Sequence, residues 1–204
     1  MRDLLCCGAM SDGLVVRNSY RVACSLGVMR GMGDGEVDLV LADPPYSEFP
    51  LINDSIREAR RVCRGACLYF MYAEDLCLLD EQPDQVLFWV KPVSTKNTSR
   101  RYSRFVEVIA AYGVDRINQG LHWSNRTGVF TDHLVRKQVH PFEKPASLIE
   151  RLVLNHSSPG DTVLDPFAGV GTVHRCCVGN GRGSISVEID GQWAEHINPG
   201  HVVG

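Results

Sequence analysis

The sequence predicts an α/β protein, because short apolar strands alternate with helical segments and two strands end in an aspartate followed by an unusual turn. Its 204 residues fit a single domain, 1–204, that is large enough to bury a core. The hydrophobic share of 44% and the charged share of 22% are ordinary for a globular protein. No run reaches the ~18–20 apolar residues that span a bilayer. The start of the chain lacks the pattern of a signal peptide, so we expect a cytoplasmic protein.

Strand and helix patterns follow one another along the chain. Residues 37–42 are mostly apolar and end at Asp43, where two prolines stop the strand. Residues 51–64 place Ile52 and Ile56 on one helical face, with arginines elsewhere. Residues 113–139 lack periodicity and are interpreted as a short insertion. The remaining strands are expected at 20–24, 66–72, 85–90, 106–112, 162–164 and 184–188. The remaining helices are expected at 26–33, 74–80 and 145–156, and a last helix follows the turn after the strand 162–164 and ends at about 178.

Charge is segregated along the chain although the net charge is only −3. Residues 91–144 carry ten Lys/Arg against four Asp/Glu, whereas the remainder carries 11 against 20. This distribution is typical of a face that meets a phosphate backbone, and a solvated basic loop is an equal alternative. The eight cysteines form no CxxC and the histidines no HExxH, so we expect reduced thiols and no metal site.

The turn after the strand 162–164 carries two glycines, Gly169 and Gly171. They allow positive φ and a close approach of the backbone to a ligand, and the next helix offers free amides at its start. Glu188 ends the following strand, where an acid can accept hydrogen bonds from ribose hydroxyls. A purely structural turn with a surface acid is the alternative. The spacing favours a nucleoside site.

The turn after the strand 37–42 reads Asp43-Pro44-Pro45-Tyr46. An exocyclic amine on a base is a weak nucleophile, because its lone pair is delocalised into the ring. The Asp43 carboxylate and the Pro44 carbonyl can each accept one N–H and free that lone pair, and the two prolines fix the carbonyl direction. Tyr46 offers a ring on which an extruded base can stack. The alternative is a Pro-Pro turn capped by Asp43.

Together these segments resemble the amino-methyltransferases of DNA in their β-type order. The DPPY tetrapeptide precedes the run Asp165-Pro166-Phe167-Ala168-Gly169-Val170-Gly171-Thr172, which resembles the cofactor motif DPFxGxGT. Val187-Glu188-Ile189-Asp190 resembles the acidic motif that follows. His140-Pro141-Phe142-Glu143-Lys144-Pro145 is similar to an HPxxKP segment, and Trp89-Val90-Lys91-Pro92 with Arg104-Phe105-Val106-Glu107 is similar to W-x-KP…RF-x-E. The resemblance covers about residues 20–193.

The resemblance implies a circularly permuted, Rossmann-like methyltransferase fold: a seven-stranded, mostly parallel sheet with a terminal hairpin and helices on both faces. It implies S-adenosylmethionine as cofactor and double-stranded DNA as partner, with methyl transfer to adenine N6 of a flipped base, because Asp stands first in the tetrapeptide. It assigns catalysis to Asp43, Pro44, Pro45 and Tyr46. The cofactor is assigned to Lys144, Pro145, Asp165, Phe167, Ala168, Gly169, Gly171, Thr172 and Glu188.

Two departures from the family pattern shape the remaining expectations. Ala23-Cys24 stand where relatives have Gly-Asp, so one carboxylate contact is missing, and the gap at 113–139 is short for target recognition. We therefore expect a short or loosely read site, or recognition shared within a homodimer. Phosphate contacts are expected from Lys96, Arg100, Arg101 and Arg104. N4-cytosine methylation and a weakly catalytic, cofactor- and DNA-binding subunit are the alternatives to a stand-alone enzyme of bacterial restriction-modification type.

Overall fold

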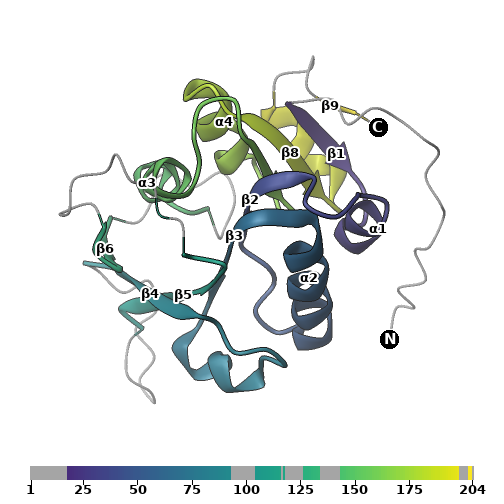
Figure 1. Cartoon of the computed structure of the whole chain (residues 1–204). Coiled ribbons are helices and arrows are strands. Elements are labelled where there is room, and N and C mark those ends of the chain that lie inside the picture. The colour runs from purple at the N-terminus through teal and green to yellow at the C-terminus, as the bar shows by residue number, and fades with distance from the viewer. Residues whose placement is uncertain are drawn as a thin grey trace.

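A mixed sheet with helices on both faces forms the body of the protein (Figure 1). The computed structural model describes residues 18–92, 104–115, 117, 126–133, 143–197 and 202–203. Its strands are β1 (Ser19–Val22), β2 (Val37–Ala42), β3 (Cys63–Met71), β4 (Gln85–Val90), β5 (Val106–Tyr112), β6 (Val129–Thr131), β7 (Thr162–Asp165), β8 (Gly183–Glu188) and β9 (Val202–Val203). Its helices are α1 (Ser25–Arg30), α2 (Phe49–Val62), α3 (Ala146–His156) and α4 (Thr172–Gly179), with 3-10 helices η1 (Ala73–Leu78) and η3 (Gly191–His196).

The strand order is β6-β4-β5-β3-β2-β7-β8-β1-β9. Among the strands that the structure describes, only β5 runs antiparallel to its neighbours, β3 and β4, and the other pairs are parallel. The seven strands from β4 to β1 are the predicted sheet, with the antiparallel β4–β5 pair as the expected hairpin. The short strands β6 and β9 add an edge on each side. The predicted fold class is therefore confirmed.

The permuted order brings the two ends of the chain together in the sheet. The N-terminal β1 pairs with β8, placing Ser19 opposite Ile185, and β2 pairs with β7, placing Leu39 opposite Val163. Figure 1 shows the purple β1 beside the yellow-green β8. Because parallel strands end at the same edge, the turns after β2 and β7 open side by side.

Two apolar layers hold the helices to the sheet. On one face, α1 and α2 pack buried side chains such as Met29 and Ile56 against alternate residues of the central strands. On the other face, α3 and α4 pack residues such as Leu152 and Cys177. The central strands are buried on both faces, which explains why 37–42 reads as a nearly continuous apolar run.

The observed elements agree with most expected ranges to within three residues. The segment expected as a short helix at 74–80 is a 3-10 helix, and the insertion 113–139 contains β6, whose Val129 pairs with Phe88 of β4. Much of that insertion lies outside the described residues. Across the described part of the chain, no helix has the length and hydrophobicity needed to cross a membrane.

Candidate active site

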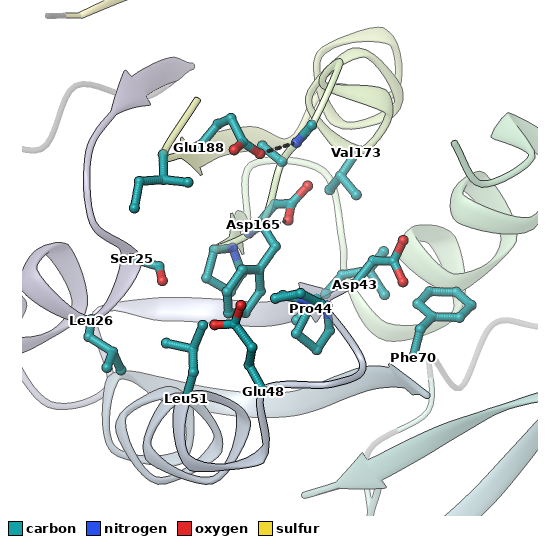
Figure 2. Close-up of a pocket in the computed structure, with 18 of the residues that line it drawn as sticks. Ser25, Leu26, Asp43, Pro44, Glu48, Leu51, Phe70, Asp165, Val173 and Glu188 are labelled. Carbon is teal, nitrogen blue, oxygen red and sulfur yellow. Dashed lines mark hydrogen bonds between the residues drawn. The ribbon is translucent and has the colours of Figure 1, made fainter. Parts of the chain in front are cut away.

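The turns after β2 and β7 border one cavity of about 730 Å³. Its walls come from the ends of β1, β2, β7 and β8 and from the first turn of α2, and Figure 2 shows the side chains that face it. This volume lies within the ~300–1,000 Å³ that is typical of small-molecule sites. The predicted meeting of Asp43 with the glycine turn is therefore observed.

The glycine turn adopts a backbone that side chains disfavour. Gly169 has φ 48° and Gly171 has φ 75°, both in the left-handed region. A Cβ built on Gly171 would lie 2.2 Å from Cδ1 of Ile197. The Tyr20 hydroxyl donates a hydrogen bond to the Gly169 carbonyl at 2.5 Å, so a residue of β1 fixes the position of the turn. The backbone of Gly169 is thereby held at the wall of the cavity.

Glu188 is held by backbone amides at the end of β8. Its Oε2 accepts a hydrogen bond from the amide of Gly169 at 2.8 Å, and its Oε1 accepts one from the amide of Asp190 at 3.0 Å. A carboxylate has about four acceptor positions, so each oxygen keeps capacity for a further donor. Both oxygens can thus accept a further hydrogen bond, and the binding of ribose hydroxyls by Glu188 stays a prediction.

Asp165 lines the cavity and is almost fully buried, with 3% of its surface exposed. Its Oδ1 accepts a hydrogen bond from the amide of Phe167 at 3.1 Å. Burial, reinforced by the carboxylates of Asp43 and Glu188, raises the pKa of Asp165 well above its ordinary value. The cavity is lined by six acids against two basic residues, Arg30 and Lys144, and this excess favours a ligand that carries positive charge and hydrogen-bond donors.

Asp43 is bound by two polar partners. The Lys144 ammonium group lies 2.7 Å from Oδ1 and 2.6 Å from Oδ2, and the Tyr46 hydroxyl donates to Oδ1 at 2.9 Å. Burial raises the pKa of Asp43, and the adjacent Lys144 opposes that rise. Lys144 therefore favours the ionised form of Asp43.

The same polar cluster extends to Glu107 of β5. The Tyr46 hydroxyl lies 3.0 Å from Oε2 of Glu107, and its single proton can serve only one of the two carboxylates at a time. Glu107 also forms a buried ion pair with Lys91, and Lys144 lies 3.4 Å from its Oε2. These cations lower the pKa of Glu107 against the effect of burial. Asp43 is thus the outermost member of a charged network.

The sequence predicted no role for Lys91 or Glu107, although both belong to the segments that resemble W-x-KP and RF-x-E. The available signal was Glu107 itself, a charged residue next to the wholly apolar remainder of the strand 106–112. Such an acid is retained in a sheet only when it is paired.

The other residues of the tetrapeptide, Pro44, Pro45 and Tyr46, have different surroundings. Pro44 lines the cavity, and among the described residues no donor reaches its carbonyl, whereas the Pro45 carbonyl accepts the Glu48 amide at 3.1 Å. The Tyr46 ring lies edge-on to Tyr72, with centroids 4.7 Å apart. Its role as a stacking surface for a base stays a prediction.

Most of the residues predicted to hold the cofactor line the cavity, whereas Pro145 and Gly171 do not belong to its lining. The cavity is lined by Phe167, Ala168, Gly169 and Thr172 as well as Asp165 and Glu188. Lys144 also lines it, but its ammonium group binds Asp43, and Pro145 directly precedes α3. Ala23 and Cys24 line the cavity at the end of β1.

Of the expected phosphate contacts, only Arg104 belongs to the described residues; Lys96, Arg100 and Arg101 lie outside them. Arg104 is exposed, forms an ion pair with Glu74 at 2.5 Å, and stacks its guanidinium 4.0 Å from the Tyr72 ring centroid. Lys91 and Lys144 are likewise paired internally. Part of the basic segment therefore serves the site itself.

Comparison with known proteins gives a family and a fold. The profile of a DNA methylase family, N6_N4_Mtase, matches residues 89–199. The type II methyltransferase M.HpaI of Haemophilus parainfluenzae is 26% identical over 86% of this chain and 72% of its own length. The DNA adenine methyltransferase YhdJ of Escherichia coli K12 is 44% identical over 26% of this chain and 18% of its own.

Solved structures agree with the fold. The M1.HpyAVI–SAM complex has a TM-score of 0.69 at 20% identity and covers 87% of this chain and 96% of that one. The cytosine-N4-specific PvuII DNA methyltransferase has a TM-score of 0.74 at 13% identity and covers 89% and 85%. These identities are low, so the two structures establish the arrangement of the elements.

Proposed function

The chain belongs to the N6/N4 DNA methylase family, and on that premise we propose that it transfers a methyl group from S-adenosylmethionine to adenine N6 in double-stranded DNA. The observation that carries the proposal is the junction of two turns at one cavity. Asp43 and the unclaimed Pro44 carbonyl face the same space as the glycine turn and Glu188.

The residues present fit the cofactor. Glu188 keeps acceptor capacity for ribose hydroxyls, the turn at Gly169 and Gly171 brings backbone close to a ligand, and the acidic lining suits a cation. S-adenosylmethionine supplies a methyl group made electrophilic by its sulfonium. The relative M1.HpyAVI was solved with SAM, which supports the same choice for this chain.

The chain's own contribution to the reaction is positioning and charge. The Asp43 carboxylate accepts one N–H of the target amine and the Pro44 carbonyl accepts the other, which directs the nitrogen lone pair toward the cavity. The N–C bond would form as the C–S bond to the sulfonium breaks and a neutral thioether leaves, so that the nitrogen becomes cationic and must lose one proton. We assign that proton to Asp43, because its carboxylate already accepts this N–H in the proposed arrangement and Lys144 stabilises its ionised form beforehand.

The choice of adenine rests on Asp as the first residue of the tetrapeptide and on the adenine activity named for YhdJ. An N4 amine of cytosine has the same hydrogen-bonding pattern and would meet the same acceptors, and the fold is shared with a cytosine-N4-specific enzyme. Cytosine is therefore the second candidate.

The test is transfer of a labelled methyl group to duplex DNA, followed by digestion to nucleosides. We expect label in N6-methyladenine with the wild type and a loss of at least ~100-fold in Asp43→Ala, since the carboxylate that orients the amine is gone. Asp54→Ala is the matched control, because Asp54 also lines the cavity but pairs with Arg57 on the exposed surface of α2.

If the label is found in N4-methylcytosine, the target base is cytosine and not adenine. No transfer by the wild type, with S-adenosylmethionine still bound, would instead support the cofactor-binding subunit. In that case the first variant to make would replace Ala23-Cys24 by Gly-Asp, because the present pair leaves the end of β1 without a carboxylate.

A further inference from the structure

Glu48 is a charged residue of the cavity wall that the proposed reaction does not use. It directly precedes α2, lines the cavity and is exposed. Among the described residues its carboxylate has no hydrogen bond and no ion pair. The other carboxylates of the wall each have a partner in the structure: Asp43, Asp54, Glu143, Asp165 and Glu188.

Glu48 lies on the side of the cavity that α1 and α2 form, and these helices contribute Leu26 and Leu51 as well as the charged residues Arg30 and Asp54 to the lining. In Figure 2 its carboxylate points from the start of α2 toward the interior, on the side of Leu26 and Leu51, whereas Asp43 and Phe70 lie on the opposite side. The end of β1 borders the same space with Ala23, Cys24 and Ser25, none of which carries a formal charge. Among the described acids of this side, Asp54 is paired with Arg57, so Glu48 is the acceptor that stays available beside Leu26 and Leu51.

The layout indicates which part of a nucleoside cofactor belongs there, on the basis of the proposed function. The transferable methyl group must face Asp43, and Glu188 is oriented toward the ribose. The purine ring is then left with the compartment of Leu26 and Leu51, whose apolar walls suit a flat ring. The ring brings an exocyclic amine with two N–H donors into that compartment.

We propose that Glu48 accepts a hydrogen bond from the exocyclic amine of the cofactor's adenine and makes the cavity selective for adenine over hypoxanthine. An ionised carboxylate is an acceptor only, so it attracts an amine and repels the carbonyl oxygen that replaces it in hypoxanthine. It would supply from α2 a contact that the uncharged end of β1 cannot. Because Glu48 is exposed, we expect an effect of about tenfold in affinity.

Calorimetric binding of S-adenosylhomocysteine and S-inosylhomocysteine tests this selectivity without any turnover. The wild type should bind the adenine compound about tenfold more tightly. Glu48→Gln should reduce that ratio to near one, because a carboxamide both donates and accepts. Asp54→Asn should keep the wild-type ratio, because the carboxylate of Asp54, further along α2, is already paired with Arg57.

The failure of the inference is separable from that of the proposed function. If the wild type binds neither compound nor S-adenosylmethionine, the proposed function fails. If it binds the adenine compound and Glu48→Gln keeps the full preference, only the role of Glu48 is overturned. A third ligand, 5′-methylthioadenosine, lacks the amino-acid tail: a loss in Glu48→Gln for S-adenosylhomocysteine but not for this ligand would assign Glu48 to the ammonium group and also overturn the proposal.

Discussion

The contact between Lys144 and Asp43 joins residues that are 101 positions apart and sets the charge of the acid proposed to hold the target amine. Both Asp43 oxygens lie within 2.7 Å of the ammonium group, which is itself almost buried, with 9% of the Lys144 side chain exposed. Burial acts in the opposite direction and raises the pKa of Asp43. Lys144 is thus a positioning residue whose effect should be visible in a pH profile.

Replacing Lys144 by Met should raise the pKa of Asp43 further, because the burial remains while the cation is lost. The ionised form is the one that accepts the N–H, so it would be depleted from the acid side upward. We expect the acidic limb of the rate profile to move to higher pH and the rate at pH 7 to fall by ~10–100-fold. The measurement is single-turnover methyl transfer across the pH range.

Lys91→Met is the control for this experiment. Lys91 pairs with Glu107 and does not contact Asp43, so its loss should leave the acidic limb near the wild-type position. Thermal unfolding of both variants checks that they are folded. If the limb stays in place in Lys144→Met as well, Lys144 does not control the ionisation of Asp43.

Individual site residues were predictable from the sequence only where local pattern points to them. Asp43, Asp165 and Glu188 each stand at or just past the end of an apolar strand, and parallel strands deliver such ends to one edge. The Lys144–Asp43 pair depends on how α3 packs over the sheet, which no local pattern encodes. For the same reason the sequence did not assign Glu107, whose partners come from three separate segments.

At the scale of elements, the turn between β7 and α4 depends on a glycine that faces η3. Gly171 has φ 75°, and Ile197, just past η3, occupies the space where its side chain would stand. Gly181 has nearly the same φ, 73°, but nothing lies within 4 Å of a Cβ built there. A substitution at Gly181 therefore tests the cost of the left-handed backbone alone, whereas one at Gly171 also tests the contact with Ile197.

Gly181→Ala should cost about 1 kcal/mol of unfolding free energy from the left-handed backbone alone. Gly171→Ala should cost about 2–3 kcal/mol, since Ile197 must also move. Ile197→Val removes the Cδ1 atom that a Cβ at position 171 would meet, so the double variant should be more stable than the sum of its single changes predicts, by ~0.5–1 kcal/mol. Denaturant unfolding of the wild type and the four variants gives these free energies. If the effects of Gly171→Ala and Ile197→Val simply add in the double variant, Ile197 does not restrict the turn.

The longer elements were predictable because their periodicity is strong, and β2, β4 and β5 have the expected bounds. The sequence did not predict η3 or the edge strands β6 and β9. Each of these strands has two or three residues, too few to show an alternation. Their pairing is decided by the strand they lie against.

At the scale of the whole molecule, the order of motifs along the chain and the order of strands in the sheet describe the same permutation. The seven-stranded sheet and the membership of the N6/N4 DNA methylase family confirm the expected fold and the expected DNA amino-methyltransferase class. The base, the homodimer and the range of the target site stay predictions. Long-range order was predictable here because the motifs, rather than the periodicity, fix which strands are neighbours.

The charge distribution of the whole molecule leads to a prediction about DNA. Residues 91–144 have an excess of basic side chains, but Lys91, Lys144 and Arg104 form ion pairs within the protein. The contribution of this segment to DNA binding should then come from its other cations, among which Arg100 and Arg101 are adjacent. Each phosphate neutralised on duplex DNA contributes ~0.9 to the slope of log K against log salt.

The double variant Arg100→Ala/Arg101→Ala should therefore bind duplex DNA more weakly and reduce the magnitude of that slope by about 1.8, the loss of two phosphate contacts. Binding of S-adenosylhomocysteine should not change, because the contacts proposed for the cofactor come from other residues, such as Gly169 and Glu188. Arg57→Ala is the control: Arg57 is an exposed arginine on α2 that pairs with Asp54. Fluorescence anisotropy over a salt series gives the slopes. Equal slopes for the double variant and the wild type would move the DNA-binding face away from this segment, since a phosphate contact cannot be lost without releasing its share of the salt dependence.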